Sequence, residues 1–248
     1  MKQFPLIFRH FLIRSFLDPI TIIFLIILPL GIVILTSVIN IAAGAQDIPM
    51  QVTAIATLFM ISFQFASGDV LSYSIYDDIR GPVRWRLLAT PVPPGTFFTG
   101  AFAASWVFNI VQGILIVGAT ALLFDTRWGN MFVFAVVLLL VSVISQLMAL
   151  TIAHFAPTRK MASGIITAIV LFMMFSSGAL FVPLGDSAFA VFLQSYGTPL
   201  ALAWRAILFS GLAEDNMSQA MFNIGILGVI AAVLAGLVLI LGRRKKAL

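Results

Sequence analysis

The chain has 248 residues, of which 61% are hydrophobic and 9% are charged, and its formal net charge is +5. Soluble domains are about half apolar and about a quarter charged, so this composition cannot cover a globule with polar surface. A soluble enzyme and a DNA-binding protein are thereby excluded, and the sequence predicts an integral membrane protein. The absence of cysteine excludes disulfides, thiolate metal sites and a cysteine nucleophile.

The first predicted element is an amphipathic helix over residues 2–17. One half of its helical wheel carries Phe4, Ile7, Phe8, Phe11, Leu12 and Phe16. The charged Lys2, Arg9 and Arg14 fall in the other half. A basic helix with one aromatic face lies in the plane of the membrane interface, and Asp18-Pro19 would end it. If these residues merely extended the first span, three charges would be buried in lipid.

Long uncharged stretches predict six transmembrane helices, because about 20 apolar residues suffice to cross the hydrocarbon core. We place them at about 19–41, 50–72, 96–124, 131–155, 161–182 and 218–242. The first stretch is longer than the apolar region of a signal peptide, so we expect it to be retained.

Another apolar stretch, 187–204, is interrupted by polar and turn-forming residues at 194–199. It predicts a re-entrant or interfacial extracellular segment between spans five and six, because polar backbone is tolerated in a membrane only against protein or water. The predicted fold class is therefore an all-α integral membrane protein, with residues 1–248 forming a single transmembrane domain.

The basic residues predict the orientation of the spans. If the N-terminus is cytoplasmic, only Arg127 and Arg205 of the 14 Lys and Arg residues lie outside. Basic residues near span ends favour the cytoplasmic side. We therefore expect both termini in the cytoplasm of a cell-membrane protein, with the basic C-terminal tail drawn to anionic lipids.

Two connections have room for a functional element, the inner one at 73–95 and the outer one at 183–215. Within the first, Gly81-Pro82 is a suitable helix start, and the prolines from Pro91 onward end the helix about two turns later. Exposed apolar side chains ringed by charge mark a protein contact. A helix that rests on lipid headgroups fits the composition equally well. The helix would display Val83, Trp85, Leu87 and Leu88 among arginines, after Asp77 and Asp78.

This inner loop resembles that of the ABC-2 type permeases, the membrane subunits of one class of ATP-binding-cassette exporters. That family carries an acidic-x-x-Arg/Glu-Gly-Thr stretch followed by Leu-Leu-x-Thr-Pro after its second span. The chain matches at Asp78, Arg80, Gly81, Leu87, Leu88, Thr90 and Pro91. It departs at Pro82, where threonine is usual, and at Arg84, where an acidic residue is common.

A second match lies about 100 residues further on. The family's small-Gly-x-x-Phe-x-Pro, Pro-Leu and Ala-x-Arg pattern is similar to the residues at Gly178, Pro183, Pro199 and Arg205. The six-span layout and the basic N-terminal helix also fit this family.

The resemblance implies that the short cytoplasmic helix is a coupling helix, which docks into a groove on an ATPase subunit. The implied docking residues are Asp77, Asp78, Arg80, Gly81, Val83, Arg84, Trp85, Leu87 and Leu88. It also implies that two permeases pair, as a homodimer or as a heterodimer with a related chain. No Gly-x-x-x-x-Gly-Lys-Ser/Thr loop occurs in the sequence, so we expect ATP on a separate chain and no cofactor, metal or enzymatic activity on this one.

Polar and methionine residues inside the spans are candidates for a substrate path. The second span resembles the family's pore-facing helix, which implies roles for Thr57, Gln64 and Phe65. Interhelical hydrogen bonding for the amides and core packing for the methionines are the alternatives. Asp69 and His154 lie near cytoplasmic span ends, where they can reach water. The further candidates are Asn109, Gln112, Met173 and Met174.

The leading functional hypothesis is an export permease for an amphipathic or lipid-like substrate. A secondary carrier or channel is the alternative, but it would place carboxylates or discontinuous helices at mid-membrane, and the middles of these spans contain no acid. A membrane enzyme is disfavoured because His-Glu-x-x-His, Gly-x-Ser-x-Gly and carboxylate clusters are missing from the sequence.

Overall fold

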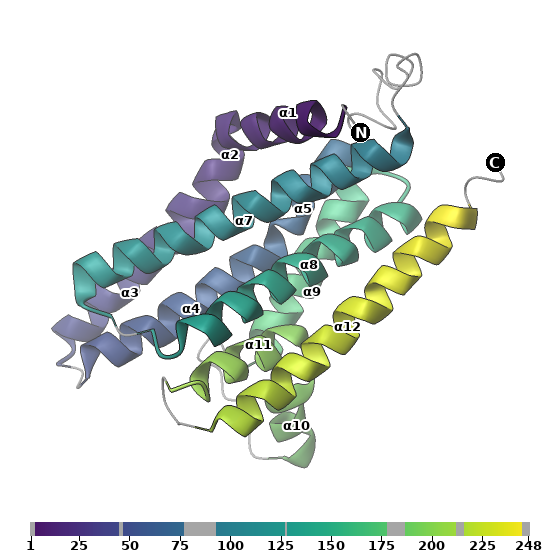
Figure 1. Ribbon diagram of the computed structural model, residues 1–248. Coiled ribbons are helices and arrows are strands. Elements are labelled where there is room, and N and C mark those ends of the chain that lie inside the picture. The colour runs from purple at the N-terminus through teal and green to yellow at the C-terminus, as the bar shows by residue number, and fades with distance from the viewer. Residues whose placement is uncertain are drawn as a thin grey trace.

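The computed structural model describes residues 3–44, 47–76, 93–126, 128–177, 187–211 and 216–244. The regular elements in these ranges are helices (Figure 1). They are α1 (Phe4–Leu17), α2 (Pro19–Ile22), the π-helix η1 (Ile23–Ile27), α3 (Leu28–Ala42), α4 (Ile48–Ala66), α5 (Gly68–Ile75), α7 (Pro94–Phe124), α8 (Met131–Phe155), α9 (Arg159–Ser176), α10 (Ala188–Tyr196), α11 (Pro199–Leu208) and α12 (Met217–Arg244).

Six helices are long and apolar enough to cross a membrane, which confirms the predicted all-α membrane fold. They cover Pro19–Ala42, Ile48–Tyr73, Gly95–Phe124, Met131–Phe155, Arg159–Ser176 and Met217–Gly242. Two of them are composite, since the first joins α2, η1 and α3 and the second joins α4 and α5. These bounds lie within two residues of the predicted ones, except that the predicted end of the fifth span, at 182, lies outside the described residues.

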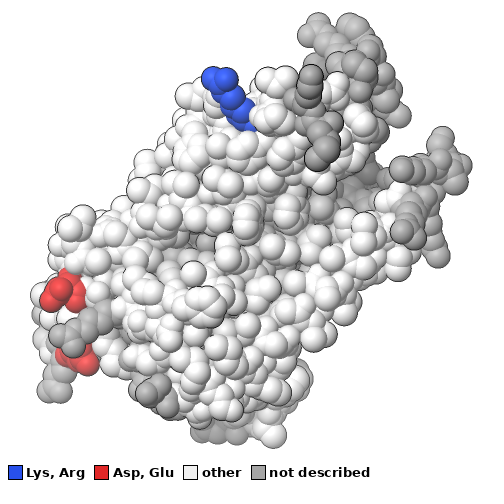
Figure 2. Space-filling view, viewed as in Figure 1, with Lys and Arg blue, Asp and Glu red and all other residues white. Residues whose placement is uncertain are grey.

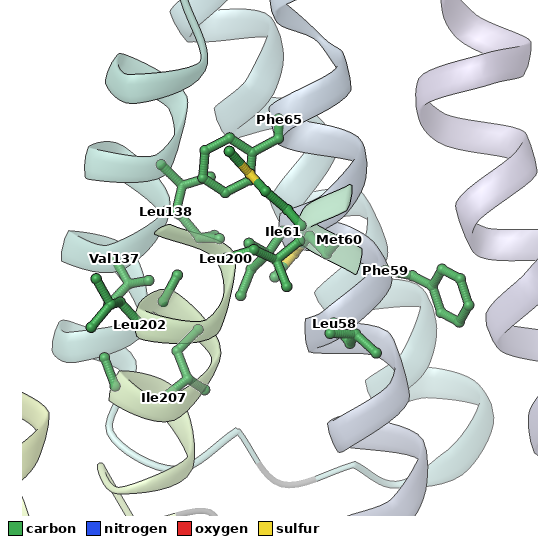
Figure 3. Close-up of a cluster of buried hydrophobic side chains, with 14 of the residues drawn as sticks. Leu58, Phe59, Met60, Ile61, Phe65, Val137, Leu138, Leu200, Leu202 and Ile207 are labelled. Atoms are coloured by element: carbon green, nitrogen blue, oxygen red, sulfur yellow. The ribbon is translucent and has the colours of Figure 1, made fainter. Parts of the chain in front are cut away.

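The second and fourth spans form the centre of the bundle. In their most apolar stretches 67% and 61% of the residues are buried, against 11% in the sixth span. Side chains from α4, α8 and α11 meet in the main core, among them Ile61, Leu138 and Leu200 (Figure 3). The remaining spans surround this centre and turn apolar side chains outward, as helices in contact with lipid must.

The stretch at 187–204 forms parts of two short helices, α10 and α11, that are joined by a tight turn. Neither is long enough to cross a membrane. Thr198 caps α11 by accepting a hydrogen bond from the backbone N–H of Ala201 at 3.2 Å, and Pro199 occupies the first turn, where its missing N–H costs nothing. Six of the ten α11 residues are buried, so this helix is part of the core.

A second apolar cluster, which we call the basal core, lies at the end of the bundle that carries α1. Its buried members are Phe11, Leu71, Tyr76, Phe97, Ala101, Ala104, Ala153, Ala156 and Ala162. These residues belong to α1, α5, α7, α8 and α9 or to their ends. The C-terminal end of α12 lies at the same end of the molecule (Figure 1).

The predicted aromatic face of α1 packs on α7. The rings of Phe11 and Phe97 meet edge to face, with their centroids 5.0 Å apart. A Cβ atom on Gly100 would lie 2.6 Å from the side chain of Ile7, so glycine at this position permits the close approach of α1. Ser15, which interrupts the aromatic face, donates its hydroxyl to the backbone oxygen of Phe11 at 3.0 Å.

Charge is confined to the ends of the bundle on the face seen in Figure 2. Blue basic atoms appear near α1, and red Asp atoms appear at the opposite end, where α4 begins and α7 ends. The broad zone between them carries no charge in this view. Such a belt suits the hydrocarbon layer of a bilayer.

Candidate functional site

The predicted docking residues fall outside the described residues. They are Asp77, Asp78, Arg80, Gly81, Val83, Arg84, Trp85, Leu87 and Leu88, and their role stays a prediction. What the structure describes are the two anchoring points of this segment, Tyr76 before it and Pro93 after it. Both belong to the end of the bundle that contains the basal core.

Tyr76 ties the end of α5 to the C-terminus of α8. Its side chain is buried, and its hydroxyl donates to the backbone oxygen of Ala156 at 2.5 Å, with that of Ala153 at 3.2 Å. The last carbonyls of a helix have no hydrogen-bond partner within the helix. The Tyr76 hydroxyl supplies a donor to them at the end of α8. A displacement of residue 76 is therefore transmitted to the turn between α8 and α9.

The other anchoring point leads into α7. Pro93 is extended (φ −60°, ψ 135°) and precedes Pro94 in the first turn of the helix, a position that suits proline. One turn later Phe97 contacts Phe11 of α1. The segment at 77–92 thus connects two helices that meet in the basal core.

Buried polar side chains connect α4, α7 and α8 in the membrane interior. The Gln64 side-chain amide donates to the backbone oxygen of Asn109 at 3.2 Å, and the Asn109 amide donates to the Ser142 hydroxyl at 2.8 Å. With its amide in the favourable orientation, Gln146 donates to Phe102 O and accepts from Trp106 N, both at 3.0 Å. Gln64, Asn109 and Gln146 therefore make hydrogen bonds between helices, which is the alternative role that we gave for amides inside the spans.

The candidates for a substrate path lie inside the chain. Thr57, Gln64, Phe65, Asn109 and Gln112 are at most 1% exposed. Thr57 donates to the backbone oxygen of Thr53 at 2.7 Å, whereas neither side-chain amide atom of Gln112 has a hydrogen-bond partner among the described residues. Their contact with a substrate remains a prediction.

The second span is interrupted between α4 and α5, a feature that the sequence analysis missed. The Gly68 N–H donates to the Ser145 hydroxyl at 3.1 Å, and that hydroxyl donates to the backbone oxygen of Phe65 at 2.8 Å. A Cβ atom on Gly68 would lie 2.6 Å from the backbone oxygen of Ser145. One serine of α8 thus pairs the Phe65 carbonyl and the Gly68 N–H at the interruption, while Ser67 keeps helical dihedral angles and bonds within the span.

A cavity of about 390 Å³ lies between the first, second and fifth spans. Its apolar wall is formed by α2, η1, α4, α5 and α9, and includes Phe24, Leu25, Phe63, Ile166, Val170 and Met174. Met174 alone among the predicted path residues lines it, and Met173 is buried beside it in α9. Its polar side chains include Asp18, Thr21, Asp69, Tyr73 and Ser163.

Two carboxylates line this cavity. Asp69, in the first turn of α5, accepts a hydrogen bond from the Ser163 hydroxyl at 2.8 Å through Oδ2. Asp18, which joins α1 to α2, accepts from the Ile20 N–H at 3.2 Å and from the Thr21 hydroxyl at 2.5 Å. The Arg159 guanidinium lies 3.6 Å from the centre of the Tyr73 ring, a cation–π contact. Asp69 is half-buried and lines this cavity, and its expected contact with water stays a prediction.

Comparison with known proteins identifies the family. The family model described as ABC-2 type transporter matches residues 2–196, which is most of the chain. The chain belongs to the ABC-2 type transporter family. None of the curated proteins and none of the solved structures matches it. The family and the six apolar helices together make it a multi-pass membrane protein and an ABC transporter permease. ABC-2 membrane domains generally pair with an ATP-binding-cassette subunit.

The ABC-2 match ends before α11, so Pro199 and Arg205 lie beyond it. Arg205 donates to the Ser195 hydroxyl at 2.6 Å and has the rings of Tyr196 and Phe209 within 5.3 Å of its guanidinium carbon. These contacts join α10 to α11, which fits a structural role. The other two positions of the second family pattern, Gly178 and Pro183, fall outside the described residues.

Replacing Tyr76 with phenylalanine is expected to destabilise this ABC-2 permease by about 1 kcal/mol, because a buried hydrogen bond to two helix-end carbonyls is lost. Thermal unfolding in detergent measures the change. Tyr196→Phe is the matched control, since that hydroxyl makes an exposed hydrogen bond with Gln219. Equal melting temperatures for the two variants would contradict the anchoring role of Tyr76.

Proposed function

We propose that this chain is the permease subunit of an ATP-driven exporter. It moves an amphipathic or lipid-like substrate outward across the cell membrane, and both of its termini are cytoplasmic. A separate ATPase subunit binds ATP and docks on the segment at 77–92. The observation that carries the proposal is the family match over a chain whose sequence holds the docking motif but no phosphate-binding loop.

The geometry at the basal core supports this coupling. The docking segment leaves α5 at Tyr76 and enters α7 at Pro93. Tyr76 contacts the end of α8, and the next helix, α9, begins at Arg159. Because α5 and α9 are also walls of the cavity, a push on the segment changes the separation of those walls. Closure of the ATPase subunits would thereby alter access to the cavity.

The charge distribution supports the cytoplasmic placement of the basal core. Lys and Arg lie near α1 and acidic residues lie at the far end in Figure 2, as the preference of basic residues for the cytoplasmic side requires. The exporter is proposed to contain two permeases, since closed two-fold pairing is the commonest oligomer symmetry. The apolar faces of α3, α9 and α12 supply surface for lipid and for a second permease.

Purification of the tagged permease from its native membrane tests the proposal. We expect it to bring down a chain that carries the Gly-x-x-x-x-Gly-Lys-Ser/Thr loop and hydrolyses ATP, in a complex that contains two permeases by mass. Outward transport should stop when ATP hydrolysis in the partner is abolished by substitution of its loop lysine. Transport that continues without that hydrolysis would contradict the proposal and favour a secondary carrier.

A further inference from the structure

We propose that the cavity between α2, η1, α4, α5 and α9 binds an amphiphile with a primary ammonium headgroup. The headgroup lies at Asp69, and the hydrocarbon chain lies along Phe24, Val170 and Met174. The identification of this amphiphile as the transported substrate rests on the proposed function, whereas its binding does not.

Charge complementarity is the first argument. Asp18 and Asp69 are carboxylates, and no Lys or Arg occurs among the described residues that line the cavity. Arg159 lies beside the cavity, stacked on Tyr73, and does not belong to its lining. A charge in an apolar surrounding is costly unless it is paired. The acidic lining therefore favours a cationic headgroup over an anionic one.

Hydrogen bonding narrows the headgroup to one with N–H donors. Both carboxylate oxygens of Asp18 accept hydrogen bonds from the chain. Asp69 accepts from Ser163 through Oδ2. The Tyr73 hydroxyl and the Arg159 charge also lie close to this carboxylate, but its buried Oδ1 has no donor in hydrogen-bond geometry among the described residues. An unsatisfied buried acceptor on a charged group is expensive. A primary ammonium brings three donors, whereas a quaternary ammonium brings none.

The shape of the cavity favours a single hydrocarbon chain. About 390 Å³ is at the lower end of the roughly 300–1,000 Å³ that small-molecule sites have, which is too small for a glycan-bearing lipid. Ile20, Phe24 and Leu171 line the cavity and are 70%, 56% and 46% exposed. The mouth therefore opens sideways onto an apolar surface, and an amphiphile can enter from the lipid without crossing water.

The position of the carboxylates sets the orientation of the ligand. Asp18 is the residue at which α1 ends, so the acidic side of the cavity lies next to this amphipathic helix. Phe24 and Leu25 belong to the π-helix η1, and π-turns in α-helices frequently mark functional sites. The headgroup thus lies near the level of α1, and the hydrocarbon chain extends toward the middle of the membrane.

Titration of the purified permease with dodecylamine tests the inference. Isothermal calorimetry in maltoside detergent compares it with dodecyltrimethylammonium, which lacks N–H donors, and with 1-dodecanol, which lacks charge. We expect saturable binding of dodecylamine at least about tenfold tighter than that of either comparator, which corresponds to about 1.4 kcal/mol. Equal affinities, or no saturable binding because a second copy covers the mouth, would overturn the inference.

Two variants locate the site. Asp69→Asn is expected to weaken dodecylamine binding at least about tenfold, whereas Asp47→Asn, an acid outside the cavity at the start of α4, leaves it unchanged. Should Asp69→Asn fail to fold, Leu171→Trp provides a second route, because it narrows the mouth at a position that is already half exposed. Binding unaffected by a folded Asp69→Asn or by Leu171→Trp would overturn the inference.

Lipid analysis of the purified protein distinguishes the two sources of such a headgroup. Enrichment of a single-chain membrane lipid with a primary ammonium headgroup in the wild type over Asp69→Asn identifies a resident membrane lipid. Dodecylamine binding without that enrichment identifies a free alkylamine. Absence of both would overturn the inference. Calorimetry of the permease needs no ATPase subunit, so the two proposals can fail separately. If dodecylamine does not bind but the ATPase subunit co-purifies, this inference alone is rejected. If dodecylamine binds but no ATPase subunit co-purifies, the proposed function alone is rejected.

Discussion

Aspartate at both Leu87 and Leu88 is expected to release the ATPase subunit from the permease completely. We propose these two leucines as the apolar anchors of the docking segment, from their match to the family motif. Burying one leucine is worth about 1.5–3 kcal/mol, so losing two weakens the complex by about 3–6 kcal/mol, or more than about a hundredfold. Burial of the new carboxylates adds to this loss. Co-purification of the ATPase subunit with tagged permease measures the effect, and ATP-driven transport should disappear with it.

The matched control is the pair Phe189→Asp and Phe192→Asp. Both phenylalanines are exposed side chains of the short helix α10, at the opposite end of the bundle from the basal core (Figure 1). The control makes the same kind of change and adds the same charge, and it should leave ATPase association intact. Normal membrane insertion of both double variants is required. An ATPase subunit that remains bound to Leu87→Asp/Leu88→Asp would refute the docking assignment.

Replacing Gly68 with alanine is expected to destabilise the bundle by about 3 kcal/mol. The new Cβ would lie 2.6 Å from the backbone oxygen of Ser145 and 2.9 Å from its hydroxyl oxygen. Relief requires α5 to move away from α8, which breaks the Gly68–Ser145 hydrogen bond. The backbone of Ser145 cannot move aside as the end of a flexible side chain could. Chemical unfolding in mixed detergent micelles measures the loss.

Gly118→Ala serves as the control for this prediction. Gly118 lies in α7 with no atom within 4 Å of a built Cβ, so alanine there removes no contact and raises helix propensity by up to about 1 kcal/mol. The two substitutions are chemically identical and differ only in what the methyl group meets. Similar stabilities for both variants would show that the α5–α8 contact yields easily.

The sequence predicts the fold well because the bilayer imposes strong constraints. Uncharged stretches of about 20 residues have few alternatives to a membrane-spanning helix. The break at Asp18-Pro19 and the aromatic face around Phe11 likewise define α1. The helical wheel does not reveal that this face packs on α7, because a protein surface and a lipid surface select the same apolar side chains.

The candidate site was harder to predict, because it combines residues from three spans. Asp18, Asp69 and Ser163 are far apart in the sequence and meet only through packing. Hydropathy does not report which face of a span looks inward, so the sequence alone does not show that Gln64 and Asn109 lie in a buried hydrogen-bonded layer. Their contact with a substrate stays a prediction. The polar Ser67-Gly68-Asp69 triplet in an apolar stretch was the signal for both the interruption and the cavity.

The π-helix η1 reduces the winding of the buried edge of the first span. The buried residues of α2, η1 and α3 recur at every fourth position, at Thr21, Leu25, Pro29, Val33 and Ser37. An α-helix turns about 100° per residue, so such a series would wind about 40° around the axis at each step. In η1 each residue rotates by a smaller angle about the axis than in an α-helix, which cancels part of this winding. Loss of one residue from η1 would therefore rotate α3 relative to α2 and turn a different set of α3 side chains toward α4.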